Sequence, residues 1–475
     1  MRREHSEQGA WASEEFGHTE LGDSRRTRRL LQMVTRAAQR PAGTVTAVFS
    51  KGRERQGAYD FLESKYVNAA SLSFAAGRAA AERAARLRFA FVAIDGTSLG
   101  LTDQLEAKGF GSVGNLDKGG RGLKVINALG LTPEGIPLGM FSQIWWARRN
   151  AKKRTKQEKK NDARRRDAAD KETGHWLEAI DEAASRAEHA GAALWFLLDR
   201  EADGQDVLSK LAATGHRFTV RGSWNRRLDA GEQSPKYLRD VIEKTARKGD
   251  YFLNVAASPT RSARCAQMVV RWQRVTLRLL DPKTRTIRLL PVNAVLTREQ
   301  GTCPVGEEPL DWLLLTNNPV STLEEARDVI DGYAKRWRVE DLHKAWKTGA
   351  CNVEQTQLRT MRSVTVWATI LASVAVRIER LKLLSRTEPE LPATVELSMP
   401  EIGALILLKR ENKKRNEVIP DAIPSIGQAT VWIAELGGYT GKSSGGPPGS
   451  ITIRRGLEQL QVAARVYAAL APPEK

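Results

Sequence analysis

The residues with the clearest chemical potential lie between positions 333 and 347: Tyr333, Arg336, Glu340 and Lys347. If this run is one helix, at about 100° per residue, the four side chains fall within an arc of roughly 60°. The arginine and the lysine carry positive charge and the tyrosine is a hydroxyl donor, so this face is suited to bind phosphate. Because a glutamate among them would repel phosphate, the pattern predicts a divalent metal ion between the two.

Two aspartates earlier in the chain can complete an acidic site. Asp95 follows the apolar run 89–94 and Asp199 follows the apolar run 193–198, and both runs are typical of buried strands. Since adjacent parallel strands bring their carboxyl ends to one edge of a sheet, we expect Asp95, Asp199 and Glu340 to lie together. Oxygen ligands without His or Cys favour Mg²⁺ or Mn²⁺. Two such ions would activate a water or a 3′-hydroxyl and stabilise the leaving oxygen of a phosphodiester.

Each acid also has an ordinary structural interpretation. Asp199, which precedes a predicted helix, is by itself more often a helix N-cap. Asp95, which precedes a glycine, is more often a turn residue. Glu340, with cations four residues away on both sides, would ordinarily form surface ion pairs. The combination of these acids with the phosphate-binding pattern favours the metal site, in which Asp203 or Asp341 can replace a neighbour as ligand.

Composition points to a polyanionic partner. The chain has 475 residues, with 75 Lys and Arg against 56 Asp and Glu, a net charge of +19. This balance suits nucleic acid, whereas no run approaches the ~20 apolar residues of a membrane-spanning helix. The first residues lack the apolar core of a signal peptide, so we expect a cytoplasmic protein without a membrane partner. The three cysteines are scattered and match neither a disulfide framework nor a zinc site.

The elements that must position the acids can be read along the chain. Residues 21–62 read as basic helices, which are either a small DNA-reading module or a solvated helix pair. From 70 to 221 the order is strand, hairpin with a turn at 132–135, helix and strand, as in a ribonuclease H-like sheet. The basic block 148–166 is interpreted as a solvated surface near DNA.

The second half of the chain has a different sequence pattern. Short strands at 251–255, 268–272, 275–280, 288–296 and 312–316 predict an inserted β region, and the chain after 349 is mainly helical. Helices are expected at 363–383, 399–408, 430–436 and 453–470. Trp312 is by default a core residue, although it can instead stack an unpaired base. Trp337 and Trp346 are interpreted as packing residues.

These motifs together resemble the insertion-sequence-four family of bacterial cut-and-paste transposases. The spacing Tyr333-x2-Arg336-x3-Glu340-x6-Lys347 is similar to the family's Y-R-E-K signature. Further matching motifs follow in family order at 21–26, 56–61, 93–99, 199–203, 217–221, 312–316 and 343–350. The resemblance therefore runs nearly from end to end.

The resemblance implies a fold and a site. The fold is α/β, a ribonuclease H-like catalytic core with a β-rich insertion, flanked by helical N-terminal DNA-binding and C-terminal dimerisation regions. The implied acidic triad is Asp95, Asp199 and Glu340, which bind two Mg²⁺ or Mn²⁺ ions. Trp312 would receive a flipped base, which replaces its interpretation as a core residue. The implied DNA-binding residues are Tyr333, Arg336, Lys347, Trp312, Arg221, Lys344, Arg25 and Arg26.

We therefore predict a DNA transposase with an end-binding domain at 1–69, a catalytic domain at 70–375 with its insertion at about 222–315, and a dimerisation domain at 376–475. It would hydrolyse phosphodiesters, form hairpins and transfer strands. Its partners would be double-stranded DNA, as terminal inverted repeats and as target, and a second copy in a synaptic homodimer, in the cytoplasm at the nucleoid. The alternatives are a ribonuclease H-like structure-specific nuclease or resolvase, and a non-catalytic DNA-binding repressor.

Overall fold

The computed structural model describes residues 10–470, except 104–106, 115–119, 149–171, 230–235, 258–260, 282–283, 302, 414 and 443–445. The chain divides into two compact units. The central unit contains Ala85–Asp95 and Ala151–Trp337, and the terminal unit contains Met1–Ala84, Gly96–Asn150 and Arg338–Lys475. Apart from Arg148, the basic block predicted to lie near DNA is outside the described residues.

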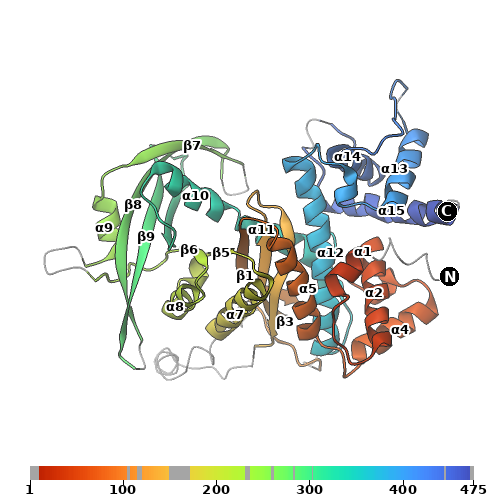
Figure 1. The fold of residues 1–475 in the computed structure, drawn as a ribbon, viewed down its shortest axis with the longest axis horizontal. Helices are drawn as coiled ribbons and strands as arrows, with labels where there is room; N and C mark the ends of the chain where they lie inside the picture. Colours follow the sequence, from red (N-terminus) through yellow and green to blue (C-terminus); the bar gives the residue numbers. More distant parts are fainter. Residues whose placement is uncertain are drawn as a thin grey trace. The chain divides into compact units, whose positions relative to one another are not determined.

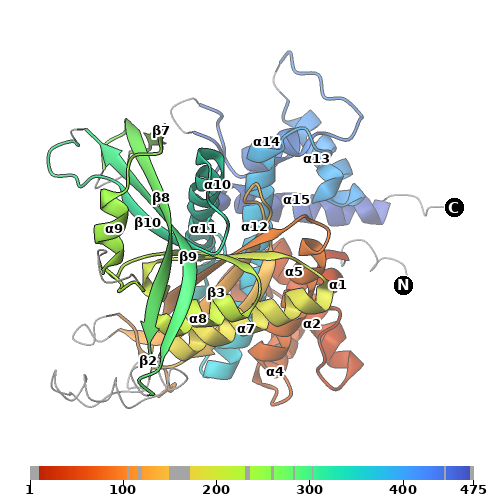
Figure 2. The ribbon, with the colours of Figure 1, turned by 60° about the vertical axis from the view of Figure 1, so that its left-hand side comes forward.

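The central unit is built on parallel strands. In it, β1 pairs in parallel with β5, β5 pairs in parallel with β6, and β10 continues the sheet antiparallel to β6. All five residues of β5 are buried, as expected for an apolar strand covered on both faces. Helices α7 and α8 lie side by side (Figures 1 and 2). This alternation confirms the predicted α/β class. The elements are β1 (Ala90–Gly100), α7 (Glu172–Ala190), β5 (Leu194–Leu198), the 3₁₀ turn η4 (Arg200–Ala202), α8 (Gln205–Ala213), β6 (Arg217–Arg221), β10 (Asp311–Thr316) and α10 (Leu323–Ala334).

The predicted β insertion extends the sheet from β10 through β9 and β8 to β7. Strands β8 and β9 form a long antiparallel ribbon (Figure 2). The prediction of two strands at 268–272 and 275–280 is wrong, because Gln273 and Arg274 continue the ladder opposite Ala294 and Asn293. Exposed polar side chains interrupt the apolar pattern without interrupting the backbone pairing. The elements are α9 (Leu238–Lys244), β7 (Gly249–Val255), β8 (Arg264–Leu280) and β9 (Ile287–Gln300).

The terminal unit combines helices with the predicted hairpin. Strands β3 and β4 pair antiparallel around a turn in which Thr132 N donates to Ile136 O at 2.8 Å and Gly135 has φ 92°. The basic helices predicted at 21–62 are present, and Asp23 caps the first of them by accepting from the backbone N–H of Arg25. The elements are α1 (Ala10–Phe16), α2 (Ser24–Gln39), α3 (Val45–Val48), α4 (Gly52–Glu63), α5 (Ala69–Ala84), β2 (Gly111–Ser112), β3 (Arg121–Leu131), β4 (Pro137–Trp146) and α11 (Trp337–Lys347).

The C-terminal part of this unit is helical, as predicted. Its longest helix, α12, packs against α5 and β4 and against α14 and α15 (Figure 1). By length and composition α12 is apolar enough to cross a membrane, so the expectation that no run approaches that length is wrong. In the most apolar 18-residue stretch of α12, 83% is buried inside the protein. Packing in the protein core therefore explains why this helix is so apolar. The elements are η5 (Val353–Gln355), α12 (Met361–Thr387), η6 (Ala393–Val395), α13 (Met399–Glu411), α14 (Ile426–Leu436) and α15 (Ser450–Leu470).

Two boundaries near the predicted site differ from expectation. The strand that carries Asp95 does not end there but continues to Gly100. The run from 333 to 347 is not one helix, because α10 ends at Ala334, Lys335 and Arg336 form a turn, and α11 begins at Trp337. The inference that four side chains share one helical face is therefore wrong. Tyr333 belongs to α10 and Arg336 to the turn, whereas Glu340 and Lys347 belong to α11.

Candidate active site

Asp95 and Asp199 follow directly on paired residues of two neighbouring parallel strands. The register of β1 and β5 pairs Ile94 with Leu198, and each aspartate is the next residue in the chain: Asp95 within β1 and Asp199 directly after β5. Neighbouring strands lie about 4.8 Å apart, so the two Cα atoms are close at this edge of the sheet. Asp95 is buried and Asp199 is half-buried. The parallel pairing therefore accounts for two of the three predicted acids at one edge.

Asp199 is also an N-cap, as its ordinary interpretation predicted. Its Oδ1 accepts from the backbone N–H of Glu201 at 2.7 Å and so caps the 3₁₀ turn η4. A carboxylate has two oxygens and about four lone pairs, so one capping bond leaves acceptor capacity for a cation. The cap orients the side chain, and the two interpretations of Asp199 are compatible.

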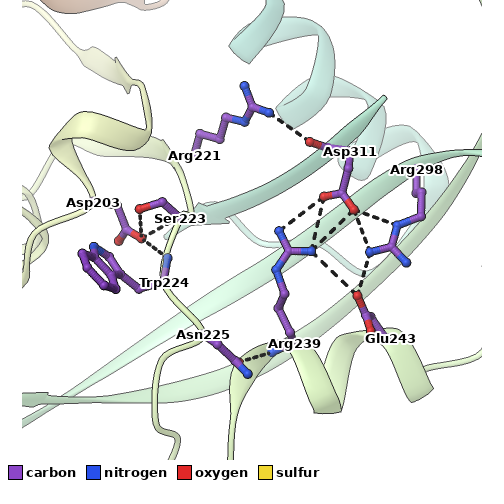
Figure 3. Close-up of polar contacts among 9 residues, drawn as sticks. All are labelled: Asp203, Arg221, Ser223, Trp224, Asn225, Arg239, Glu243, Arg298 and Asp311. Carbon is purple, nitrogen blue, oxygen red and sulfur yellow. Dashed lines mark hydrogen bonds and ion pairs between the residues drawn. The ribbon is translucent and has the colours of Figure 1, made fainter. Parts of the chain in front are cut away.

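The carboxylate of Asp203, by contrast, forms its bonds with other residues of the protein. Its side chain is fully buried and forms an ion pair with Arg226 at 2.6 Å. It also accepts from the backbone N–H groups of Ser223 at 2.7 Å and Trp224 at 3.0 Å (Figure 3). Through these bonds, the Asp203 carboxylate holds the loop after β6 in place. The alternative in which Asp203 replaces Asp199 as a metal ligand has no support in this geometry.

Arg336 lies beside Asp95. One guanidinium nitrogen is 3.6 Å from Asp95 Oδ2, and both side chains are almost fully buried. A buried carboxylate requires a compensating positive charge, and Arg336 supplies it. The turn between α10 and α11 brings Arg336 to this position. The guanidinium predicted to bind phosphate is thus placed beside a predicted metal ligand.

Tyr333 and Trp312 form an aromatic pair in the central unit. Their ring centroids are 5.5 Å apart in an edge-to-face arrangement. Tyr333 is only 2% exposed, whereas Trp312 is half-buried. Burial raises the pKa of the Tyr333 phenol above its ordinary value, while Arg336 and Arg221 act in the opposite direction. The phenol therefore stays protonated at neutral pH as a hydrogen-bond donor, and Trp312 has both a packed edge and an accessible surface.

Charged side chains fix the start of β10, the strand that carries Trp312. Arg221 donates to the backbone carbonyl of Asp311 at 3.0 Å, and the Asp311 carboxylate lies between Arg239 and Arg298 (Figure 3). Arg298 also pairs with Glu243 of α9 at 2.6 Å. This network holds the residue directly before Trp312. Arg221, expected to contact DNA, thus also contacts the backbone of β10.

Helix α11 carries the remaining predicted residues in the terminal unit. Glu340 lies in its first turn. At the other end, Lys347 Nζ is 3.4 Å from Thr97 Oγ1 and 3.6 Å from Glu354 Oε1. Glu354 in turn accepts from the backbone N–H of Gly100 at 2.8 Å. These contacts join the end of α11 to residues 96–100 of β1, which belong to the same unit as α11. Lys344 is exposed.

A buried polar chain supports α11 one turn after Glu340. His343 Nε2 lies 3.0 Å from Asn127 Nδ2, and Asn127 Oδ1 accepts from Gln143 Nε2 at 2.9 Å. With the Asn127 amide as donor, His343 Nε2 is the acceptor, which assigns the proton to Nδ1. All three side chains are buried. The hairpin β3–β4 therefore fixes the rotation of the helix that carries Glu340.

The predicted N-terminal DNA contacts differ in accessibility. The side chain of Arg25 is 83% exposed and forms an ion pair with Asp23 at 2.9 Å. The hydrogen bonds that Arg25 donates to the Asp23 carboxylate lower the pKa of Asp23 to about 2. Arg26 donates to the backbone carbonyl of Leu21 at 2.7 Å and lies 4.0 Å from the ring centre of Tyr66. Arg25 is therefore presented to solvent, and Arg26 contributes to the packing of its domain.

Sequence reasoning missed or misassigned several residues here. The sequence does not predict that His343, Asn127 and Gln143 support α11. Asn127 and Gln143 lie on the hairpin and His343 lies about 200 residues later, so no sequence pattern relates them. The exposed loop tryptophan Trp224 was not singled out. Trp346 is buried as predicted, but the packing interpretation of Trp337 is wrong, because this side chain is 52% exposed.

The carboxylates fit a divalent cation. Asp95 and Asp199 are neighbouring oxygen donors at one sheet edge, and like charges this close repel unless a cation lies between them. Arg336 supplies one positive charge beside Asp95. Hard oxygen donors of this kind suit Mg²⁺ or Mn²⁺.

Three family models match the chain. A transposase DNA-binding model matches residues 8–67, a transposase DDE domain model matches 144–377, and a transposase Tn5 dimerisation domain model matches 373–470. Together with the strand order and the acids, these matches define a DDE transposase, a metal-dependent enzyme that cleaves DNA and transfers its strands. The chain belongs to the Tn5 type within the insertion-sequence-four family, as its sequence signature predicted.

The family assignment confirms the predicted ribonuclease H-like core. The strands β1, β5 and β6 belong to the ribonuclease H-like core of a DDE domain, and the match to that domain includes Asp199 and Glu340. Asp95 precedes the matched residues, so its place rests on the parallel pairing of β1 with β5. The family uses a divalent metal ion, and the chain binds DNA and forms dimers. A transposase that acts on DNA works in the cytoplasm.

Proposed function

We propose that this transposase moves a bacterial insertion sequence by cut-and-paste transposition, in association with the nucleoid. It would recognise the terminal inverted repeats of its element through residues 1–69, pair two ends in a homodimer through residues 376–475, and insert them into target DNA. The catalytic domain would extend from 70 to 375. The observation that carries the proposal is the pair of carboxylates, Asp95 and Asp199, that follow paired residues of two parallel strands.

Asp95, Asp199 and Glu340 would be the ligands of two Mg²⁺ or Mn²⁺ ions. When bound, such a pair activates the attacking oxygen and stabilises the leaving oxygen of a phosphodiester. The chain's own contribution is to hold the acids in place. The capping bond to Glu201 orients Asp199, Arg336 lies beside Asp95, and the contact between His343 and Asn127 fixes the helix of Glu340.

The proposed reaction is a series of displacements at phosphorus. Water attacks a phosphodiester at each transposon end, the P–O3′ bond breaks, and a 3′-hydroxyl is freed. This hydroxyl attacks a phosphodiester of the opposite strand and displaces the 3′-oxygen of the flanking DNA, which closes the end as a hairpin. A second water attacks the hairpin phosphodiester and regenerates the 3′-hydroxyl. The hydroxyl finally attacks target DNA and displaces a target 3′-oxygen. One set of acids serves every step, and no covalent bond to the enzyme forms.

The remaining predicted residues would bind the DNA. Trp312 would take a flipped base beside the hairpin, supported by its edge-to-face contact with Tyr333. Arg221 lies next to the start of the same strand and would contact the adjoining backbone. Phosphates of the end would meet Tyr333, Arg336, Lys344 and Lys347, and the N-terminal domain would contribute Arg25 and Arg26.

The test compares binding with cleavage in the full chain. Glu340→Gln, Asp95→Asn and Asp199→Asn should each bind the cognate inverted repeat within about threefold of the parent, since the basic residues remain. Each should lose Mg²⁺-dependent cleavage by at least about a thousandfold, as expected when one essential group is removed. The matched control is Glu201→Gln, an exposed acid two residues from Asp199. Retained cleavage in Glu340→Gln would disprove the assignment of the triad.

A strand-transfer assay separates transposition from simple cutting. Precleaved ends with a 3′-hydroxyl should become joined to plasmid DNA in the presence of Mg²⁺. A protein that cuts the ends and never joins them is a nuclease or resolvase, and the proposed reaction would then be wrong.

A further inference from the structure

Trp224 is an exposed tryptophan on the loop that follows β6. Of its surface, 65% is accessible. Isolated exposed apolar side chains are common on proteins, so exposure alone identifies no site. The construction of this loop, its position and its charge distinguish Trp224 from an incidental surface residue.

The loop is built on a buried carboxylate. Asp203 accepts from the backbone N–H of Trp224 at 3.0 Å and from that of Ser223 at 2.7 Å (Figure 3). Arg226, two residues further on, donates to both the side chain and the backbone carbonyl of Asp203. The backbone on both sides of the indole is therefore fixed. A side chain on a fixed backbone loses only its own rotamer freedom when it binds a partner, because the backbone is already ordered.

The loop also lies beside the segment of Asp199. Ser223 Oγ donates to the backbone carbonyl of Arg200 at 3.3 Å, and Arg200 directly follows Asp199. This places the base of the Trp224 loop against the turn that begins at a predicted metal ligand. A DNA strand whose phosphate reaches Asp199 must pass close to this loop.

The charge around the loop suits a polyanion. Residues 221–228 contain Arg221, Arg226 and Arg227 and no acidic residue. Arg226 is paired with Asp203, so the positive charge that the loop offers to a partner comes from Arg221 and Arg227. Arg227 and Arg200 are exposed, and Arg221 is half-exposed. An exposed aromatic side chain among exposed cations is the usual surface for unpaired nucleotides, because the bases stack and the phosphates are neutralised.

We propose that Trp224 stacks on an unpaired base of the DNA strand that crosses the Asp199 edge. The inference rests on the proposed function, since hairpin formation requires bases at the cut end to leave their pairs. It adds a second aromatic contact to the one proposed for Trp312. The two differ in construction: Trp312 lies on β10 with one edge packed on Tyr333, whereas Trp224 lies on a loop anchored by Asp203.

The experiment measures binding of the full chain to its cognate end, with Ca²⁺ in place of Mg²⁺ to prevent cleavage. One DNA has fully paired terminal nucleotides and the other has the same nucleotides unpaired, with 2-aminopurine at each in turn. Trp224→Ala and Trp224→Leu should bind the unpaired end about 5- to 100-fold more weakly, the range expected for loss of one base–aromatic stack. Binding to the paired end should change less than about twofold.

Two further variants provide controls. Trp224→Phe keeps an aromatic face and should stay within about threefold of the parent on the unpaired end. Phe252→Ala removes an aromatic side chain that is 72% exposed on β7, the last strand in the sheet order after β8, and should change nothing. In the parent, 2-aminopurine should be quenched at one position, and Trp224→Ala should restore its emission there. Unchanged thermal unfolding midpoints show that the loop variants fold.

The outcomes are decisive in both directions. Equal binding of parent and Trp224→Ala to the unpaired end, in a parent that cuts that end, overturns the inference and leaves the proposed function intact. Equal losses in Trp224→Leu and Trp224→Phe would also overturn it, because stacking requires an aromatic face. A parent that never cuts its end contradicts the proposed function, while the binding and fluorescence comparison still decides whether Trp224 stacks.

Discussion

At the scale of single residues, two aspartates four positions apart have opposite roles. Asp199 is half-buried, and its capping bond leaves acceptor capacity, whereas Asp203 is fully buried and paired with Arg226. Both belong to the same family motif, and both are aspartates near a helix start. Asp199 is the predicted metal ligand, and Asp203 anchors the loop after β6. The sequence pattern does not distinguish the two roles, because it does not show that this loop returns to Asp203.

We predict that Asp203→Ala destabilises the protein. The substitution leaves the Arg226 guanidinium, which is only 12% exposed, without its carboxylate. Breaking one partner of a buried ion pair costs about 3–5 kcal/mol. The free energy of unfolding, measured in urea, should fall by about this amount. Glu201→Ala, at an exposed position in the same turn, should change it by less than about 0.5 kcal/mol.

The stability of Asp203→Ala also tests whether Asp203 holds the Trp224 loop. If the stability of Asp203→Ala equals that of Glu201→Ala, the bonds from Asp203 to the Trp224 loop contribute nothing, and the loop is not fixed as described. Asp199→Ala offers a useful contrast, because its capping bond to a short 3₁₀ turn should cost only about 0.5–2 kcal/mol.

At the scale of elements, the strands and helices were largely predictable because their signals are local. The apolar run of β5 and the turn before β4 specify their elements within a few residues. The failures lie where distant contacts decide. Periodicity allows one helix from 333 to 347, but Tyr333 packs on Trp312 and Arg336 lies beside Asp95, and a turn between α10 and α11 accommodates both contacts.

The candidate site shows the same division. The apolar runs directly before them identify Asp95 and Asp199, because burial on both faces gives a recognisable sequence run. Arg336, which lies beside Asp95, is more than a hundred positions away in the sequence, whereas the capping partner of Asp199 is only two residues away. No spacing rule relates Arg336 to Asp95, so the sequence places each aspartate after its apolar run but does not place Arg336 beside Asp95.

The buried polar chain behind α11 leads to a prediction about an element. Asn127→Leu removes both the donor to His343 and the acceptor for Gln143. Each buried polar group left unpaired costs about 1–3 kcal/mol, so the free energy of unfolding should fall by about 2–6 kcal/mol for the two groups. Because α11 also carries Glu340, Mg²⁺-dependent cleavage should decrease at a temperature where the variant remains folded.

The control for this variant is Asn254→Leu, an exposed asparagine on β7. It introduces the same change in side chain without removing a buried bond, and its stability should change by less than about 0.5 kcal/mol. Full cleavage activity in a destabilised Asn127→Leu would show that the polar chain supports the fold without orienting Glu340.

At the scale of the whole molecule, the sequence distributes binding and chemistry over different parts of the chain. The match to a DNA-binding domain lies at 8–67, and the match to a dimerisation domain lies at 373–470. The net charge of +19 supports binding to DNA at long range, while the acids lie between these two regions in the sequence. Pairing of ends should therefore be separable from binding of one end.

The last helix provides the means to separate them. On α15, Val462 and Val466 are 57% and 56% exposed and four residues apart, so they lie on one face. Two exposed valines within the dimerisation match are candidates for the subunit contact. Val462→Arg combined with Val466→Arg places two positive charges on each copy at this face. We expect native electrophoresis to show complexes with one end and a loss of paired-end complexes by at least about tenfold, because unpaired charges are costly in an interface.

The matched control is Val305→Arg, which adds a charge at a fully exposed valine in the central unit, outside the dimerisation match. It should preserve paired complexes and should leave binding to a single end unchanged, apart from the small gain expected from one added charge. Undiminished paired-end complexes in the α15 double variant would exclude this face from the dimer contact. Loss of single-end binding in the same variant would instead show that the C-terminal helix contributes to DNA recognition, and that binding and pairing share one surface.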